Sequence, residues 1–379
     1  MKILLLGEYS NVHHTLALGL RALGHDVTVA SNGDGWKNYP RDIDLKRQAY
    51  HRLGSFSYFF KIIRIFRLFK GYDVVQIINP IFLDLKAENI LPFYKYLRKY
   101  NKIVIMGAFG MDYYYIKACL DFKTFKYSDF NFENSERISE ENEIFKRDWL
   151  HGSKGKLNKL IVEDCDAIVA GLYEYAVAYQ NHMPYPEKLT FIPFPIILPS
   201  KSNLIIRERK KDAPVKLFIG IQAKRSVYKG TDIMLRAVQR IVHDYPNACE
   251  LHIASNIPFN EYKKMLNASE VILDQLYSYT PAMNALEAMA HGLINVGGAE
   301  PENYEILHEK ELRPIINVQP NEQSVYKELK NLILHRNELI PILQKQALSY
   351  IARHHEYCKV AKQYEKLYYT TLKRNGHYV

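Results

Sequence analysis

The sequence predicts an α/β protein with two doubly wound parallel sheets, and three observations carry this prediction. At 379 residues the chain is too long for one ordinary core and suits two domains. Strand-like runs alternate with helix-like runs, which favours parallel sheets wrapped by helices. The alternation pauses at "TFIPFPIILPSKSN" (190–203), where three prolines predict an extended linker. The expected domains are therefore residues 1–195 and 196–355, with a last helical stretch over 356–379.

The expected elements follow one another in order along the chain. In the first half, short apolar runs rich in Val and Ile predict strands at "KILLL", "DVTVA", "DVVQII", "KIVIM" and "DAIVAG", with a helix over 14–23 after the first strand. In the second half, the strands are "VKLFIGI", "CELHIAS", "VILDQL", "INVGG" and "RPIINV". Helices are expected between them over 231–243 and 260–268 and around Glu287, and the chain ends in helices.

The composition is that of an ordered, water-soluble protein, with 47% hydrophobic and 24% charged residues. The N-terminal "MKILLLGEYS" holds an apolar run of only four residues, too short for a signal peptide or a membrane span. We therefore expect a cytoplasmic protein. The four cysteines lie far apart and lack metal-binding spacing, so they predict buried free thiols and no metal site.

The positive charge is concentrated in one part of the chain. The formal net charge of +10 favours an anionic partner, such as a nucleotide, a nucleic acid or a lipid headgroup. Between Asp44 and Asp73 there are seven basic residues and no acidic one. They recur among Phe and Ile from Lys61 onward, at a spacing that gives a helix a cationic stripe and a wide apolar face. Such a helix either packs on a sheet or lies on an anionic membrane surface through residues 46–70. No nucleic-acid-binding module accompanies it, so nucleic acid is not the expected partner.

The turn after the first strand excludes one class of enzyme. It reads "GEYSNVHH" instead of GxGxxG, which argues against an NAD-dependent dehydrogenase. His13 and His14 lie in this turn, where open parallel sheets bind ligands. They are candidates for substrate contacts, and the alternative is local capping of the next helix.

A cationic loop in the second half is a candidate phosphate site. The segment "GIQAKRSVYKGTD" (220–232) follows a strand and contains Lys224, Arg225 and Lys229 before Gly230. Backbone N–H groups at a helix start, together with cations, bind phosphate oxygens. The alternative is a solvated surface loop.

One carboxylate, Glu287, lies in a run that otherwise resembles a buried helix. Thr280 and Pro281 suit the N-cap and first position of that helix, which is expected to reach His291. Asn284 lies on the same flank as Glu287. Because an unpaired buried carboxylate is costly, Glu287 either reaches solvent or binds a ligand such as the two hydroxyls of a ribose.

Three segments in the second half, "KRSVYKGTD", "LEAMAHGLINV" and "GGAEPE", occur in the order of the motifs RxxxxKG, EAMAxGxPVV and GGxxE. In these the chain resembles the GT-B glycosyltransferases, and most closely the large retaining family four. The first half is similar at "LRALGHDVTV", "YDVVQIINP" and "GMD". The resemblance implies two Rossmann-like domains that face each other across a cleft, an N-terminal acceptor-side domain and a C-terminal donor domain. It also implies that the final helix packs back on the N-terminal domain.

The resemblance assigns roles to individual residues. Lys229 and Arg225, or Lys224, would hold the diphosphate and stabilise its departure, and Glu287 would bind the ribose. Asp112 would lie on the acceptor side, as would Phe109, at a position where the family often has histidine. The family's first glutamate, eight residues before Glu287, is replaced by Tyr279. The remaining expected donor-binding residues are Gly230, Tyr279, Asn284, Gly297, Gly298 and Glu302.

The function implied is transfer of a hexose from a nucleoside diphosphate sugar, such as a UDP-sugar or GDP-sugar, to a glycan or lipid-linked acceptor. The expected setting is bacterial surface polysaccharide synthesis in the cytoplasm or on the inner face of the cell membrane. The resemblance implies a retaining reaction that needs no metal and no cofactor. The alternatives are a non-catalytic nucleotide-sugar-binding protein and a sugar-nucleotide epimerase.

Overall fold

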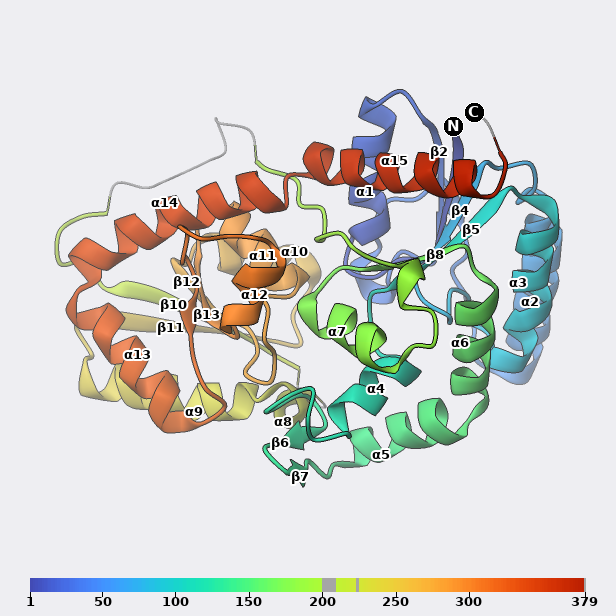
Figure 1. Cartoon of the computed structure of the whole chain (residues 1–379). Coiled ribbons are helices and arrows are strands. Elements are labelled where there is room, and N and C mark those ends of the chain that lie inside the picture. The colour runs from blue at the N-terminus through green and yellow to red at the C-terminus, as the bar shows by residue number, and fades with distance from the viewer. Residues whose placement is uncertain (200–208, 223–224, 378–379) are drawn as a thin grey trace. The chain divides into compact units, whose positions relative to one another are not determined.

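The computed structural model describes residues 1–199, 209–222 and 225–377 and divides the chain into two compact units. The first unit consists of Met1–Thr124, Asn142–Pro195 and Tyr357–Val379, and the second of Phe125–Glu141 and Ile196–Glu356. Each unit is built around a parallel sheet with helices packed against it, which confirms the predicted fold class (Figure 1). One difference concerns residues 125–141, which were expected in the first domain and belong to the second unit.

The first unit contains a seven-stranded parallel sheet in the order β3-β2-β1-β4-β5-β8-β9. The central strands are buried along their whole length, as expected of parallel strands covered on both faces. The strands are β1 (Lys2–Leu6), β2 (Asp26–Ser31), β3 (Ile43–Asp44), β4 (Val74–Ile77), β5 (Ile103–Ala108), β8 (Ala167–Ala170) and β9 (Leu189–Phe191).

Eight helices are described mainly within this unit: α1 (Val12–Ala22), α2 (Arg52–Phe66), α3 (Ala87–Tyr100), α4 (Tyr113–Cys119), α5 (Glu140–Lys146), α6 (Ser153–Asp164), α7 (Tyr173–His182) and α15 (Tyr357–Arg374). The C-terminal helix α15 packs directly on α1 (Figure 1). A Cβ placed on Gly19 of α1 would lie 2.6 Å from Ala361 Cβ and 2.7 Å from Tyr357 O, so the two helices meet where α1 has no side chain. Short helical turns occur at Gly35–Lys37, Arg147–His151 and Pro186–Lys188.

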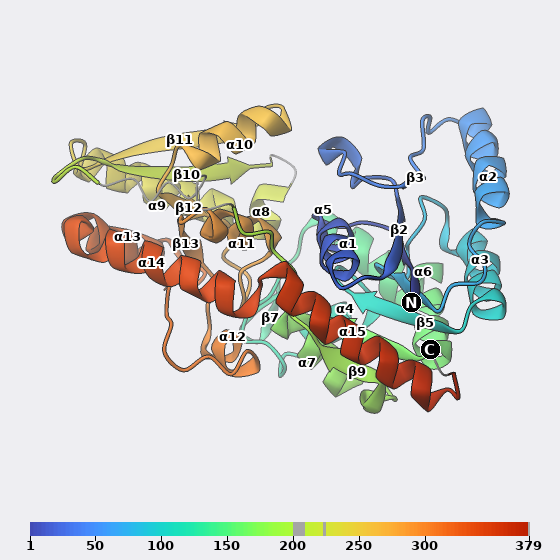
Figure 2. The same ribbon diagram turned by 90° about the horizontal axis from the view of Figure 1, so that it is seen from above.

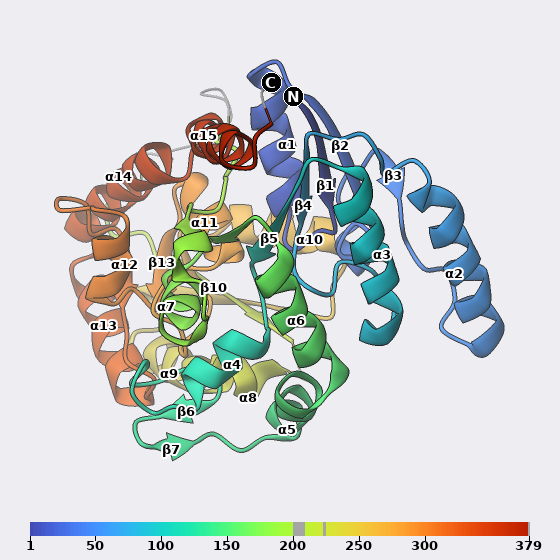
Figure 3. The same ribbon diagram turned by 45° about the vertical axis from the view of Figure 1, so that its right-hand side comes forward.

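Helix α2 packs on α3 through aromatic side chains. Figure 3 shows the two helices on the same side of the first unit. The ring centroids of Phe66 and Phe93 lie 4.6 Å apart, and Phe59 also contacts Phe93 at 5.9 Å. The inner face of α2 is therefore packed within the unit. It packs against helix α3, whereas the sequence interpretation of a packed helix placed it on a sheet.

The second unit contains a five-stranded parallel sheet in the order β11-β10-β12-β13-β14, and β10 and β11 run side by side in Figure 2. Its strands are β10 (Val215–Ile221), β11 (Cys249–Ser255), β12 (Val271–Leu273), β13 (Ile294–Gly297) and β14 (Ile316–Asn317). Its helices are α8 (Ser226–Lys229), α9 (Thr231–Asp244), α10 (Phe259–Asn267), α11 (Met283–Ala290), α12 (Pro301–Ile306), α13 (Glu322–Leu334) and α14 (Arg336–His354).

The segment Phe125–Glu141 forms a small antiparallel hairpin, β6 (Asn131–Phe132) with β7 (Ser135–Glu136). It is separated in sequence from the rest of the second unit by residues 142–195, which belong to the first unit. None of the described helices is long and apolar enough to cross a membrane.

Candidate functional site

The carboxyl ends of the strands in the second unit place the predicted donor residues at one edge of the sheet. Gly220 lies near the end of β10, Asp274 follows β12, and Gly297 ends β13. Because these strands are parallel neighbours, the loops that follow them lie at the same edge. Open parallel sheets bind ligands at this edge.

The cationic loop leads from β10 into two consecutive helices. Arg225 precedes α8, and its Nε lies 3.8 Å from Glu141 Oε1 of the hairpin segment. Lys229 ends α8 half-buried, and its carbonyl accepts a hydrogen bond from Leu276 N at 3.0 Å. In the part of the chain that is described, Lys229 forms no ion pair with a carboxylate. Its ammonium group is therefore available to an anion, whereas Lys224 lies outside the described residues.

Gly230 has a structural reason to be glycine. Its φ of +73° lies in the left-handed region, where it separates α8 from α9. A Cβ at this position would also lie 2.9 Å from both Leu276 Cβ and Tyr277 Cε2. The tight turn fixes the direction in which α9 leaves the cationic loop.

A cluster of oxygen-bearing side chains lies at the ends of β10 and β12. Tyr262 donates a hydrogen bond to Asn284 Oδ1 at 3.0 Å, and Asn284 Nδ2 donates one to Asp274 Oδ1 at 3.2 Å. Glu287 is half-buried one turn after Asn284. Burial, together with the charges of Asp274 and Glu287, raises the pKa of the Tyr262 hydroxyl. The carboxylates of Asp274 and Glu287 and the amide of Asn284 thus lie beside the cationic loop, an arrangement that suits a ligand rich in hydroxyl groups.

Helix α11 begins later than the sequence predicts. The expected start was Thr280 and Pro281, but the first helical residue is Met283 and the N-cap is Ala282, which has an extended conformation. Thr280 and Pro281 are buried in the preceding loop. The N-cap residue Ala282 makes no side-chain capping bond to α11.

At the end of β13, Gly298 leaves no room for a side chain and Gly297 leaves little. A Cβ on Gly298 would lie 1.7 Å from Ser278 O, and one on Gly297 would lie 3.1 Å from Gln275 O. Ser278 Oγ and Glu302 Oε2 are buried here without a hydrogen-bond partner among the described residues. Buried polar atoms of this kind are costly unless something satisfies them, so this loop can accept a polar ligand.

Tyr279 anchors the hairpin segment instead of facing open space. Only 4% of the residue is exposed, and its hydroxyl accepts a hydrogen bond from Lys126 N at 2.8 Å. Its ring packs on Phe125 and Tyr127, with centroid distances of 5.6 and 5.1 Å. The position that holds a glutamate in the family that the sequence resembles is therefore used for packing.

Glu300 is a carboxylate that sequence reasoning missed. Its Oε1 accepts hydrogen bonds from Tyr127 Oη at 2.6 Å, Gln319 Nε2 at 2.7 Å and Asn317 Nδ2 at 3.0 Å. Burial opposes ionisation, but these three donors outweigh it and lower the pKa of Glu300. The "GGAEPE" motif predicted a role for Glu302, and no local sequence feature distinguishes Glu300 from Glu302.

Arg137 joins the hairpin segment to the cationic loop. Its guanidinium lies 3.2 Å from the ring centroid of Tyr277. It also donates hydrogen bonds to Val227 O at 2.7 Å and Tyr228 O at 3.3 Å, immediately before Lys229. No sequence signal pointed to Arg137, because Val227, Tyr228 and Tyr277 lie 90, 91 and 140 positions further along the chain.

Three residues of the first unit that the sequence analysis predicted to contact the acceptor are buried. His13 is fully buried and bonds to Gly7 O through Nδ1 at 2.8 Å. Because a carbonyl only accepts, the hydrogen-bond network assigns the proton to Nδ1, and burial lowers the pKa of His13 to about 3. Asp112 is also fully buried: it caps α4 by accepting from Tyr115 N at 2.9 Å. Phe109 is buried edge-on against His13, so all three side chains are buried in this structure, and only His14 is half-exposed.

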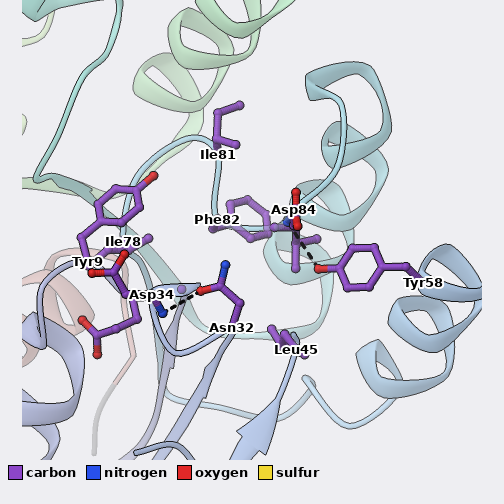
Figure 4. A pocket seen from close by; sticks show the side chains of 12 residues that line it. Tyr9, Asn32, Asp34, Leu45, Tyr58, Ile78, Ile81, Phe82 and Asp84 are labelled. Atoms are coloured by element: carbon purple, nitrogen blue, oxygen red, sulfur yellow. Dashed lines mark hydrogen bonds between the residues drawn. The ribbon is translucent and has the colours of Figure 1, made fainter. Parts of the chain in front are cut away.

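A pocket does lie at the carboxyl edge of the first sheet, but other residues form it (Figure 4). Its polar part includes Glu8, Asn32, Asp34 and Asp84, and its apolar part includes Leu45 and Phe82. Glu8 is 2% exposed and accepts hydrogen bonds from His13 N at 3.1 Å and His14 N at 2.9 Å. Burial outweighs these bonds and raises the pKa of Glu8 to about 8. A largely protonated acid therefore lines the pocket at neutral pH.

The raised pKa of Glu8 makes a prediction about stability. A carboxyl whose pKa is higher in the folded state, about 8, than its ordinary value of 4.5 stabilises the fold fully below pH 4.5. This stabilisation is lost as the pH rises through 8. We expect Glu8→Gln, which mimics the protonated acid, to reduce the fall in the free energy of unfolding between pH 5 and 8 in urea titrations. Glu163→Gln, at an exposed position, is the control; equal slopes in wild type and Glu8→Gln would contradict the assignment.

Two units that each wind helices around a parallel sheet, with a C-terminal helix returning to the first unit, define the GT-B fold. Solved structures of this fold match nearly the whole chain. Sucrose-phosphate synthase from Thermosynechococcus elongatus matches with a TM-score of 0.65 and 14% identity, covering 99% of this chain and 100% of that one. Alr3699/HepE from Anabaena, in complex with UDP and glucose, matches with a TM-score of 0.58 and 13% identity over 97% and 99% of the two chains.

An epimerase has the same fold. A putative UDP-N-acetylglucosamine 2-epimerase from Listeria monocytogenes matches with a TM-score of 0.54 and 12% identity over 99% of this chain and 98% of that one. No protein-family model matches the sequence, and no curated protein matches it. At these identities the likeness establishes the fold alone.

Proposed function

We propose that the protein is a glycosyltransferase that transfers a hexose from a nucleoside diphosphate sugar to a glycan or lipid-linked acceptor in surface polysaccharide synthesis. One observation carries this proposal: the cationic loop ending at Lys229 and the carboxylate of Glu287 follow neighbouring strands at one sheet edge. Cations suit a diphosphate, and a carboxylate suits the two hydroxyls of a ribose. The similar fold of a protein in complex with UDP and glucose supports this choice of ligand.

The chemistry asked of the site is mainly electrostatic. When the bond between the anomeric carbon and the phosphate oxygen breaks, negative charge grows on the departing diphosphate. Lys229 and Arg225 would stabilise that charge directly, so the proposed reaction needs no metal. The acceptor hydroxyl forms the new bond to the anomeric carbon and passes its proton to the departing diphosphate. We propose that configuration is retained, on the basis of the sequence resemblance.

A second candidate activity is sugar-nucleotide epimerisation. It is favoured by the fold shared with the putative Listeria epimerase and by Tyr279, which is packed where the resembled transferases have a glutamate. A protein that binds nucleotide sugars without turnover is the third candidate. All three share the nucleotide site and differ in what becomes of the donor.

The decisive experiment is calorimetric titration with UDP, GDP, TDP and CMP in the presence of EDTA, followed by incubation with sugars of the nucleotide that binds. We expect one diphosphate to saturate the protein, and its sugar conjugate to release diphosphate when acceptor is added. Conversion of the sugar without release of diphosphate would identify an epimerase. Binding without conversion would identify the non-catalytic protein, and absence of binding would overturn the nucleotide site.

The role of Glu287 is tested in the same titration. If its carboxylate binds the ribose, Glu287→Gln should lose most of the preference for ribose over 2′-deoxyribose nucleotides, a change of about 1.5 to 3 kcal/mol for a hydrogen bond to a charged group. Glu322→Gln, on α13 of the same unit, is the control. An unchanged preference would place the ribose elsewhere.

A further inference from the structure

The outer face of α2 is apolar although it is exposed. Leu53, Phe56, Phe60 and Ile63 are 76%, 58%, 65% and 37% exposed. Their spacing of three, four and three residues places them on one stripe along the helix. The inner face carries the buried Tyr58, Ile62 and Phe66, so both faces of α2 are hydrophobic. Packing within the unit accounts for only one of them.

Basic residues gather at the C-terminal end of this stripe. Arg64, Arg67 and Lys70 are exposed, and the neighbouring Leu68 is 63% exposed. None of the three cations pairs with a carboxylate among the residues that the structure describes. Lys61 behaves differently, because its Nζ donates to Lys46 O at 3.1 Å and lies 3.9 Å from Asp44 Oδ2. The stripe thus ends in three cations that the unit itself does not neutralise.

We propose that this face of α2 docks on an anionic phospholipid surface, with the apolar stripe inserted among the lipids and Arg64, Arg67 and Lys70 at the headgroups. A membrane interface combines an apolar layer with a negative surface, which complements both parts of the face. A second copy of the chain that docked through the same α2 face would cover the stripe but bring no negative charge, because the sequence between Asp44 and Asp73 contains no acid.

The same helix is also a wall of the pocket in the first unit. Tyr58, on its inner face, lines the pocket, and its hydroxyl accepts a hydrogen bond from Asp84 N at 3.3 Å. Tyr50, just before the helix, donates to Asp84 Oδ2 at 2.8 Å. Docking of α2 would therefore bring the pocket beside the lipid. If the protein has the proposed transferase function, the pocket is then the place where a lipid-linked acceptor presents its hydroxyl.

The test is flotation of the full-length protein with phosphatidylcholine vesicles that contain or lack phosphatidylglycerol. We expect binding to the anionic vesicles and at least tenfold weaker binding to the neutral ones. Phe56→Ser with Phe60→Ser should weaken binding to anionic vesicles at least about tenfold. Neutralising Arg64, Arg67 and Lys70 to glutamine should weaken it about fivefold for each charge and remove most of its salt dependence.

Matched controls come from the second unit. Leu334→Ser with Ile342→Ser removes two side chains that are 52% and 48% exposed, and Lys327, Lys330 and Lys345 to glutamine removes three exposed charges. Both control variants should bind like wild type. Thermal unfolding of every variant shows whether it is folded.

Several results would overturn the proposal. Equal binding to neutral and anionic vesicles would remove the role of charge, and equal losses in the control variants would remove the role of α2. A dimer in sedimentation that the Phe56 and Phe60 substitutions dissociate, without vesicle binding, would make the face a contact between copies. Nucleotide titration of the same preparations keeps the two proposals apart, because docking can fail while nucleotide binding persists.

Discussion

Lys229→Ala is expected to weaken the binding of a nucleoside diphosphate by about 10- to 100-fold, the range for loss of a charged hydrogen bond of about 1.5 to 3 kcal/mol. Binding of the corresponding nucleoside should change by less than about threefold, because the nucleoside has no phosphate for the ammonium group to contact. Lys229 is half-buried and has no described carboxylate partner, so its charge is not already committed within the protein. Calorimetric titration with both ligands measures the difference.

Two further variants make the Lys229 result specific. Lys229→Arg keeps the positive charge and should recover much of the diphosphate affinity. Lys216→Ala removes another cation of the second unit, one that lies 3.7 Å from Glu250, and should leave both affinities unchanged. If Lys229→Ala weakened nucleoside and diphosphate binding equally, the loop would not be a phosphate site.

Tyr279→Ala should lower the free energy of unfolding of the second unit by about 3 to 5 kcal/mol, as for other buried aromatic side chains. The substitution removes the ring that packs on Phe125 and Tyr127 and leaves Lys126 N without its acceptor. Tyr279→Phe keeps the ring and should cost only about 1 kcal/mol. Urea unfolding, monitored by far-ultraviolet circular dichroism, measures the free energy of unfolding of both variants.

The pair of Tyr279 variants also separates packing from catalysis. If Tyr279 serves packing, Tyr279→Phe should keep the nucleotide affinity and the donor turnover of the wild type. A stable Tyr279→Phe protein with strongly reduced turnover would instead show that the hydroxyl acts on the donor. In the wild type this hydroxyl accepts a hydrogen bond from Lys126 N.

The sequence was most informative where the signal is local. The strands of both parallel sheets were visible as short apolar runs, except β3 and β9, which were not predicted. Strand β9 (Leu189–Phe191) overlaps the start of the stretch predicted as a linker. The cationic loop and Glu287 are parts of contiguous motifs. The helix start was misplaced because Thr280 and Pro281 have the right chemistry for a cap but are buried in the loop before it. Local preference yields there to the packing of Gly298 against Ser278.

The errors at the site have a common physical cause. His13 and Asp112 are polar residues next to strand ends, where ligands bind, but the chain uses both for internal hydrogen bonds. Glu8 was overlooked because a single acid carries no motif, and only burial makes it unusual. Arg137 lies in the hairpin segment and Tyr279 packs against that segment, and a single sequence carries no trace of contacts between residues so far apart in the chain.

The packing of α15 on α1 has a consequence for synthesis of the protein on the ribosome. Tyr368, in a helix that is translated after the second unit, donates a hydrogen bond to Gln76 Oε1 at 2.8 Å, and Gln76 in turn contacts His13. While the second unit is being synthesised, the nascent first unit therefore has an uncovered α1 and an incomplete buried hydrogen-bond network. Domains usually fold in the order of their translation. Here the first unit is completed only after the second unit has been translated, and in the meantime the uncovered face of α1 is a surface that chaperones can recognise.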